Sequence, residues 1–343
     1  MPLLQAIRAL RTPAVIDGQS DAELVERVDT YVKRELAKSQ PPPLLLSKQL
    51  VPAIGLDLGT CVVRPIDALL RLSRATALTL PPSTASMSRW WAVLRYLGAF
   101  AAPESGRIRI DPASTVALRH NERRIFSEEL GVGFGILLGE RWCRGLGATG
   151  AVSVLDAGAA LRDKSRRLGT VGRLVPDYVL RYTDRSQPGI SFFAALECKG
   201  TQDPKSAPKQ LGHAMRQVDA LRLDGSSMPG VGIATVTNST QIAYRAVDPP
   251  GNPVSFEFVD DDLGAARETP VMVTVENSRV DVNKRDFLRR AVLLDNASLA
   301  AFGGDLAAAR RWAPAANGPQ LTSIDVRPDR IENDAWTGTT ARV

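Results

Sequence analysis

Two apolar runs joined by a polar turn bring three charged side chains together. The runs are VPDYVLRY at 175–182 and SFFAALECKG at 191–200. Their Val, Leu, Tyr and Phe content, on either side of a connection with Pro and Gly, predicts an antiparallel strand pair. A turn centred near Gln187 sets Asp177 opposite Glu197. Because side chains alternate between faces, Lys199 then lies beside Glu197 on the same face.

These three side chains have the chemistry of a metal-assisted phosphate site. Two carboxylates and an ammonium on an apolar strand pair are costly to bury without a partner, and a divalent cation provides one. Mg²⁺ takes a few carboxylate oxygens and keeps positions for water and phosphate oxygens. The alternative is an exposed hairpin with a surface ion pair, which the apolar flanks of both runs disfavour.

The order Pro176-Asp177 and then Glu197-Cys198-Lys199 resembles the PD-(D/E)xK nuclease superfamily, which has the restriction-endonuclease-like fold. The resemblance implies that Asp177, Glu197 and the backbone carbonyl of Cys198 bind Mg²⁺, for which Mn²⁺ substitutes. It also implies that Lys199 orients or helps to deprotonate the attacking water. The expected activity is hydrolysis of phosphodiester bonds in DNA by an endonuclease or exonuclease, in restriction, phage defence or repair.

An acid-x-Lys triplet indicates a nuclease site only when it lies on a predicted strand. Asp203-Pro204-Lys205 is a second match, but its Pro argues against a strand. A further clue is that Lys is rare in this Arg-rich chain, and a compact ammonium does not replace a guanidinium at a reacting site. The eight lysines are Lys33, Lys38, Lys48, Lys164, Lys199, Lys205, Lys209 and Lys284.

The family often adds an acid from the first core helix, predicted here from about residue 120. Helical spacing puts Glu129 on an apolar stripe, whereas Glu128 aligns with three glycines, at 131, 135 and 139. We favour Glu129, because a carboxylate among apolar residues is unusual and a role at the site would explain it. The glycines equally fit a face that packs closely on the sheet, which keeps Glu128 open. Glu140, near the helix end, is interpreted as a solvated charge.

Gln210 opens the helix after the triplet, where one recombination-nuclease branch of the family has Gln-x-x-x-Tyr. Ala214 occupies the Tyr position, so the match to that branch is incomplete. Gln210 remains a candidate for contacting Lys199 or a phosphate. Neighbouring His213 is interpreted as structural. Lys205 and Lys209 are candidates to meet a nucleic-acid backbone, or form a solvated helix start.

The predicted fold class is α/β: a restriction-endonuclease-like core, with a mixed central sheet flanked by helices, and a mostly helical N-terminal region. The core pattern of helix, three strands, helix and strand covers 120–240. The predicted domains are an N-terminal region at 1–110, a nuclease-like domain at 111–314 and a mobile tail at 315–343. The later segments are strands at 241–248, 253–260 and 270–280, and two helices within 284–312.

The N-terminal region contains three helical patterns. A capping box from Ser20 to Glu23 starts a helix of about 17 residues, and further helices are predicted at 64–80 and 85–101. With a short strand at 106–110, this region is compatible with a winged-helix-like module.

Two other functions compete with the nuclease. One is a nuclease-fold domain that only binds nucleic acid or a partner. The other is an actin-like ATPase, since AIGLDLGTCVV (53–63), VLDAGAA (154–160) and FGGDLAA (302–308) resemble its nucleotide loops in the right order. Pro65 and a helical pattern follow the first loop too soon, and the second loop lacks the usual polar, glycine-rich turn.

The composition of the chain bears on its binding partner and on its cellular compartment. A net charge of +6 and a pI near 9.4 suit a polyanionic partner, with DNA expected and RNA left open. Three cysteines, widely spaced, predict neither a disulfide framework nor a zinc site. No run is long enough to span a membrane. We therefore expect a soluble, cytoplasmic protein, for which monomer and homodimer both remain open.

Overall fold

The computed structural model describes residues 3–38, 48–77, 88, 90–101, 103, 106–112, 118–149, 152–162, 168–184, 190–238, 241–251, 254–257, 271–275 and 278–282. The chain divides into two compact units. One contains Met1–Pro81 and Ser88–Glu257, and the other Pro82–Met87 and Phe258–Val343. The described part of the second unit is an antiparallel hairpin of β15 (Val271–Val275) and β16 (Ser278–Val282). The predicted helices at 284–312 and tail at 315–343 lie outside the described residues.

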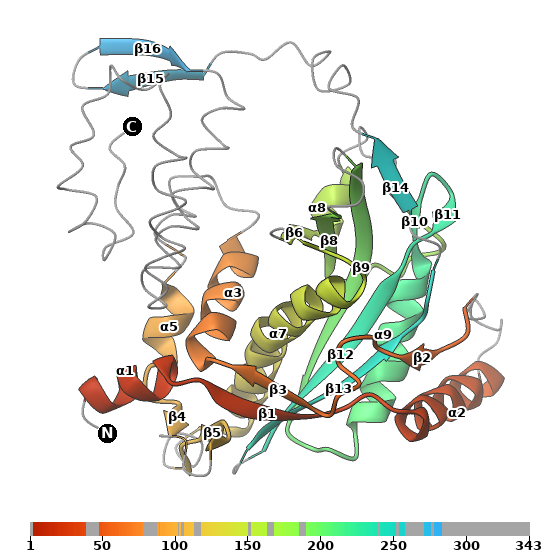
Figure 1. The fold of residues 1–343 in the computed structure, drawn as a ribbon, viewed down its shortest axis with the longest axis horizontal. Helices are drawn as coiled ribbons and strands as arrows, with labels where there is room; N and C mark the ends of the chain where they lie inside the picture. The colour runs from red at the N-terminus through yellow and green to blue at the C-terminus, as the bar shows by residue number, and fades with distance from the viewer. Residues whose placement is uncertain are drawn as a thin grey trace. The chain divides into compact units, whose positions relative to one another are not determined.

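A mixed sheet forms the centre of the first unit (Figure 1). Its nine described strands follow the order β3-β1-β13-β12-β9-β8-β6, with β14 also paired to β9 and β2 to β13. Two pairs are parallel, β1 with β13 and β9 with β12, and the other pairs are antiparallel. The strands are β1 (Ala14–Gln19), β2 (Val51–Pro52), β3 (Thr60–Val63), β6 (Ser153–Asp156), β8 (Tyr178–Thr183), β9 (Ile190–Thr201), β12 (Gly230–Thr237), β13 (Ile242–Asp248) and β14 (Val254–Glu257).

The long helix α7 (His120–Gly145) packs on one face of the sheet through its glycines. A Cβ on Gly131 would lie 2.6 Å from the amide nitrogen of Gly200, and one on Gly135 would lie 2.5 Å from the sulfur of Cys198. The helix backbone therefore approaches β9 more closely than any side chain would allow. On another side of α7, Gly133 makes a similar close approach to Ala68 of α3 (Pro65–Ala77).

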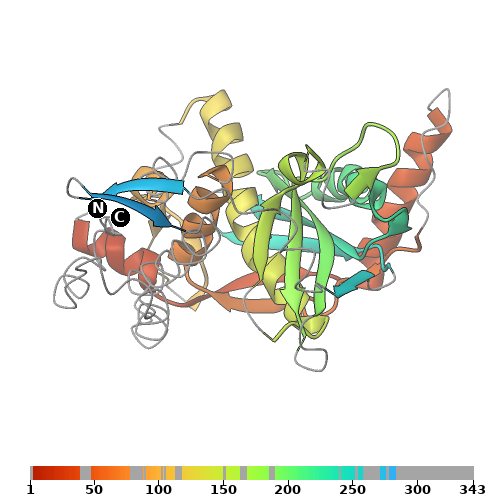
Figure 2. The same cartoon turned by 90° about the horizontal axis from the view of Figure 1, so that it is seen from above.

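The other face of the sheet is covered by α9 (Ala207–Ala220), and α2 (Ala22–Lys38) packs against α9. A shared hydrophobic core joins these two helices to β12 and β13, with Leu211 and Met215 of α9 fully buried. Figure 2 shows α7 on one side of the strands and α9 with α2 on the other. Residues of β9 thus alternate between the α7 side and the α9 side.

The remaining described elements are short. They include two small antiparallel sheets, β4 with β5 and β7 with β10 and β11. The bounds are α1 (Leu3–Arg11), α5 (Trp91–Arg95), β4 (Phe100–Ala101), β5 (Arg109–Ile110), α8 (Ala157–Arg162), β7 (Leu168–Thr170), β10 (Leu221–Leu223) and β11 (Ser226–Ser227).

The α/β class and the mixed central sheet with flanking helices are confirmed. Helix α2 has the predicted 17 residues, but its cap is Asp21, whose carboxylate accepts the backbone N–H of Leu24 at 2.8 Å. The Ser20 hydroxyl instead accepts the N–H of Ala53 at 2.7 Å. The helix predicted at 85–101 is represented by the five residues of α5.

The N-terminal region belongs to the central sheet. Strand β1 pairs in parallel with β13 and antiparallel with β3. Residues on both sides of the boundary predicted at 110 accordingly lie in one compact unit. Within the described residues, no helix combines the length and the apolarity that a membrane crossing requires.

Candidate functional site

The β8–β9 hairpin has the register that sets Asp177 opposite Glu197. Tyr178 pairs with Leu196, so the position before Tyr178 faces the position after Leu196. Two hydrogen bonds join Asp177 to Glu197 and Cys198. The backbone N–H of Asp177 donates to Oε2 of Glu197 at 2.7 Å, and the backbone N–H of Cys198 donates to Oδ2 of Asp177 at 3.0 Å. The two acids therefore face each other across adjacent strands, as the spacing predicted.

Burial makes both carboxylates reluctant to ionise. Glu197 is 0% exposed, and its pKa is raised to about 7, first by burial and then by the charge of Asp177. Burial also raises the pKa of Asp177, against the opposing effects of the Cys198 N–H and the Lys199 ammonium. The Asp156 charge raises it further. Both carboxyl groups therefore favour the neutral form unless a positive charge joins them.

Lys199 lies beside Glu197 on the same face, as alternation along the strand predicted. Its ammonium donates to Oε1 of Glu197 and, at 3.0 Å, to Oε1 of Gln217. The amide of Gln217 in turn donates to the backbone carbonyl of Val175 at 3.0 Å. Gln217 therefore ties the lysine to the segment that carries Pro176 and Asp177.

Gln217 was not predicted as a site residue, although the sequence contains a signal for it. It lies seven residues after Gln210, which is two helical turns, on the same face of α9. The structure does not bring Gln210 to Lys199: its buried Oε1 accepts no hydrogen bond in the described part of the chain. The sequence pointed to Gln210 in the first turn of α9, whereas Gln217, two turns later, makes the contact with Lys199.

Cys198 contributes its backbone to the cluster and not its side chain. The N–H is bound to Asp177, while the sulfur faces Gly135 of α7 on the other side of the sheet. Burial raises the pKa of the thiol well above its usual value, so a thiolate ligand is disfavoured. The ligand expected from Cys198 was its carbonyl oxygen, which remains a prediction.

Glu129 points away from the cluster. Its carboxylate accepts the hydroxyl of Tyr96 and lies 3.6 Å from Arg95, both at α5. Glu128 lies closer to β9, since a Cβ on Gly200 would be 2.8 Å from its Cα. The reason is that α7 packs on the sheet through its glycine face, so the apolar stripe chosen from the sequence does not face the strands. In addition, α7 packs on one face of the sheet, and the side chain of Lys199 points to the other face, toward α9.

The acids fit a hard divalent cation by their chemistry. Both donors are carboxylates, they lie in adjacent strand positions, and one ammonium offsets their charge only in part. Oδ1 of Asp177 accepts no hydrogen bond from the described residues. No cluster of three or more His, Cys, Asp or Glu side chains suited to a metal occurs in the described part of the chain. Any ion held here would take its other ligands from water, backbone or substrate.

The competing nucleotide loop does not form a hairpin. Strand β2 pairs with β13, and β3 pairs with β1, so the strands before and after residues 53–59 have different partners. Asp57 is exposed in this connection. The segment at 302–308 lies outside the described residues.

Comparison with known proteins identifies no relative. No protein-family model, no curated protein and no solved structure matches the chain. A functional assignment therefore depends on the geometry of the site.

Proposed function

We propose that the protein is a metal-dependent nuclease of the PD-(D/E)xK type that hydrolyses phosphodiester bonds in DNA. The observation that carries the proposal is the hydrogen-bonded cluster of Asp177, Glu197 and Lys199 at one point of the central sheet. Among the central strands and the two helices packed on them the chain order is α7, β6, β8, β9, α9, β12, with the short elements α8, β7, β10 and β11 in between. This order supports the proposal, because the resemblance implies a helix, three strands, a helix and a strand.

Asp177 and Glu197, with the carbonyl of Cys198, would hold Mg²⁺ or Mn²⁺, which supplies positive charge next to the scissile phosphate. The side chain of Lys199 is 26% exposed, so part of it is in contact with solvent. Glu197 and Gln217 hold its ammonium from two sides. Lys199 then orients the attacking water and offsets the charge that develops on the phosphate oxygens.

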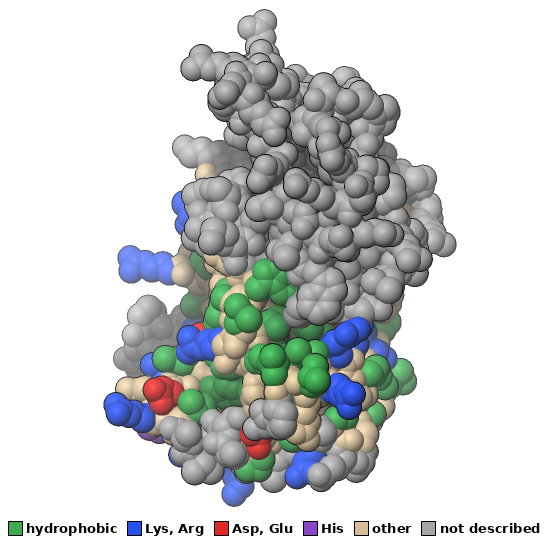
Figure 3. Space-filling model, turned by 90° about the vertical axis from the view of Figure 1, so that its left-hand side faces the viewer, with side chains coloured by type: hydrophobic (Ala, Val, Ile, Leu, Met, Phe, Trp, Pro, Cys, Tyr) green, Lys and Arg blue, Asp and Glu red, His purple; other side chains and the backbone are tan. Residues whose placement is uncertain are grey.

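The surface charge of the protein suits a DNA substrate. Figure 3 shows the side of the molecule at the left of Figure 1, where α1 and α5 lie, with Lys and Arg side chains scattered between hydrophobic ones. Lys205 and Lys209 are both exposed, at the turn after β9 and the start of α9. A basic surface next to the cluster provides sequence-independent attraction for a phosphate backbone.

The test is cleavage of supercoiled plasmid and of linear and single-stranded DNA in Mg²⁺ or Mn²⁺, with EDTA as the blank. Lys199→Ala should reduce the rate by about 100-fold or more, with fold and most DNA affinity retained. Lys33→Ala, an exposed lysine on α2, is the matched control. Wild-type rates in Lys199→Ala would remove this residue from the mechanism. DNA binding without cleavage in either metal would instead favour a domain that only binds.

A further inference from the structure

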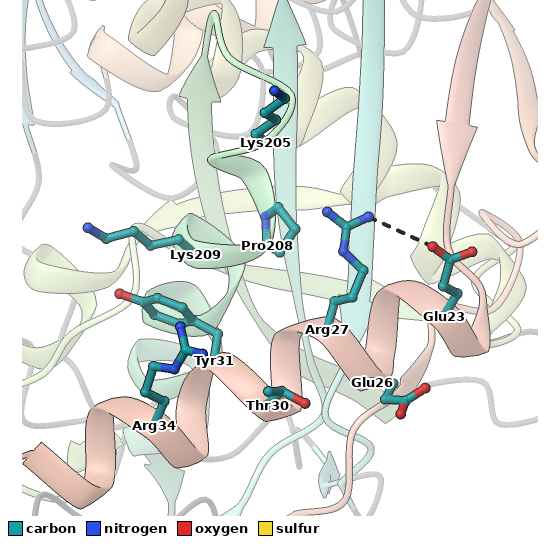
Figure 4. Close-up of a pocket in the computed structure, with 9 residues that line it drawn as sticks. All are labelled: Glu23, Glu26, Arg27, Thr30, Tyr31, Arg34, Lys205, Pro208 and Lys209. Atoms are coloured by element: carbon teal, nitrogen blue, oxygen red, sulfur yellow. Dashed lines mark ion pairs between the residues drawn. The ribbon is translucent and has the colours of Figure 1, made fainter.

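A surface groove of about 500 Å³ lies between α2 and the start of α9. Helix α2 contributes Tyr31 and Arg34, and the chain at the start of α9 contributes Lys205 and Lys209 (Figure 4). The site acids Asp177 and Glu197 are not among the residues that line it. The groove is therefore a separate feature of the surface, next to the helix that positions Lys199.

The charges in this groove are separated along its length. Figure 4 shows Arg27 with the acidic side chains at one end and Tyr31 with Arg34 and Lys209 at the other. Arg27 is 3.9 Å from Glu23. In contrast, Arg34, Lys205 and Lys209 are exposed and form no ion pair with any described residue. Three cations without an ion pair among the described residues favour an anionic ligand.

The groove is connected to the candidate site through α9. The Tyr31 hydroxyl lies 3.4 Å from Nε2 of His213, with the two rings edge to face. Burial lowers the pKa of His213, and the charges of Arg216, Lys209 and Lys199 lower it further. The ring of His213 on α9 therefore lies within electrostatic reach of Lys209 at the groove and of Lys199 at the candidate site, with Glu35 opposing their effect.

We propose that Arg34, Lys205 and Lys209 bind the phosphodiester backbone of the nucleic acid whose scissile phosphate lies at Lys199. The inference rests on the proposed nuclease function and extends it, by assigning a track for the substrate strand on α2 and α9. Contacts of this kind fix the position of a strand without reading its sequence. The groove therefore contributes affinity and register, and Lys199 with the two acids contributes the chemistry.

The test is fluorescence anisotropy with a labelled DNA single strand and the matching duplex, in EDTA so that no cleavage occurs. The triple variant Arg34→Ala, Lys205→Ala and Lys209→Ala should bind about 10-fold more weakly or worse. The slope of log K against log salt, measured from about 50 to about 200 mM, should fall by about 2 to 3, because three phosphate contacts are lost. A loss confined to one of the two DNA forms identifies the form that occupies the groove.

Two controls separate charge from folding. Lys33→Ala removes a neighbouring cation of α2 that is 73% exposed and 2.5 Å from Asp29, and it should leave affinity and slope unchanged. The triple variant Arg34→Lys, Lys205→Arg and Lys209→Arg keeps the charges and should bind like the wild type. Unchanged affinity and slope in the alanine triple would overturn the inference, as would the same loss in Lys33→Ala.

The two proposals fail separately. Cleavage by the wild type, together with normal binding by the alanine triple, rejects the groove and keeps the nuclease. Weakened binding by the triple, in a protein that cleaves nothing in Mg²⁺ or Mn²⁺, keeps the groove and rejects the nuclease.

Discussion

Glu197 and Asp248 are both buried carboxylates of the central sheet, but their neighbours differ. Glu197 meets a second acid and an ammonium on the α9 side. Asp248, on the α7 side, accepts the indole N–H of Trp142 at 3.0 Å, in a pocket of about 230 Å³ that Tyr182 and Phe192 also line. Its Oδ1 is buried without a hydrogen-bond partner among the described residues.

The same pKa shift occurs at two acids with different neighbours, so the shift alone does not distinguish a candidate site. Burial is the main cause in both, and each pKa is raised to about 7. Glu197 combines that shift with a carboxylate bonded across adjacent strands and with a partly exposed lysine that donates to it. Asp248 shares its pocket with Asp184, and the charge of Lys48 lowers its pKa. The functional assignment of the Glu197 cluster therefore depends on its hydrogen-bonded groups, and Asp248 provides a comparison for a buried acid with other neighbours.

Metal binding should show the largest difference between the two regions. Asp177→Asn removes one of two charged ligands and should weaken Mn²⁺ binding by about 100-fold. Asp248→Asn should leave it unchanged, because the expected ligands Asp177 and Glu197 lie on the other face of the sheet. Isothermal calorimetry measures both. Equal Mn²⁺ affinity in Asp177→Asn and the wild type would place the metal elsewhere.

A smaller effect is expected from the side chain that holds Lys199. Gln217→Ala removes the acceptor 3.0 Å from the ammonium and should lower kcat by about 10-fold, with little change in KM. Single-turnover cleavage and a melting curve together measure it. A loss that follows the melting temperature, or that appears only in KM, would exclude a positioning role for Gln217.

The smallest effect concerns stability against pH. The pKa of Asp248 in the folded protein is above its usual value, so between these two pKa values the folded protein binds more protons than the unfolded chain. The stability that this group contributes is therefore lost as pH rises from about 4 to about 7. Asp248→Asn resembles the neutral acid and should flatten that slope, giving a gain of about 1 to 4 kcal/mol at pH 8 over the wild type. Urea unfolding at both ends of the range tests this. Parallel pH profiles for the two proteins would contradict it.

The placement of Asp177, Glu197 and Lys199 was largely predictable from the sequence because its determinants are local. The turn between the two apolar runs fixes the register, and the register fixes Asp177 against Glu197. Lys199 then follows from alternation along one strand. Gln217 was missed because the sequence showed which face of α9 points to the site, but not which turn of the helix lies beside Lys199.

The parts that could not be predicted depend on contacts between distant segments. The pairing of β1 with β13 joins residues more than 200 positions apart, and no local pattern encodes it. Likewise, both faces of α7 were visible in the sequence, but which one packs on β9 depends on the sheet. The close approach of Gly131 and Gly135 decides this, and it moves Glu129 away from the cluster.

The most direct measurement of the central claim uses matched amides. Glu197→Gln and Asp248→Asn each replace a buried carboxylate, whose pKa is raised to about 7, by its near-isosteric amide. Plasmid cleavage in Mg²⁺ is measured for both under single-turnover conditions. We expect Glu197→Gln to lose about 100-fold or more of the rate, while Asp248→Asn cleaves like the wild type. Full activity in Glu197→Gln would contradict the account.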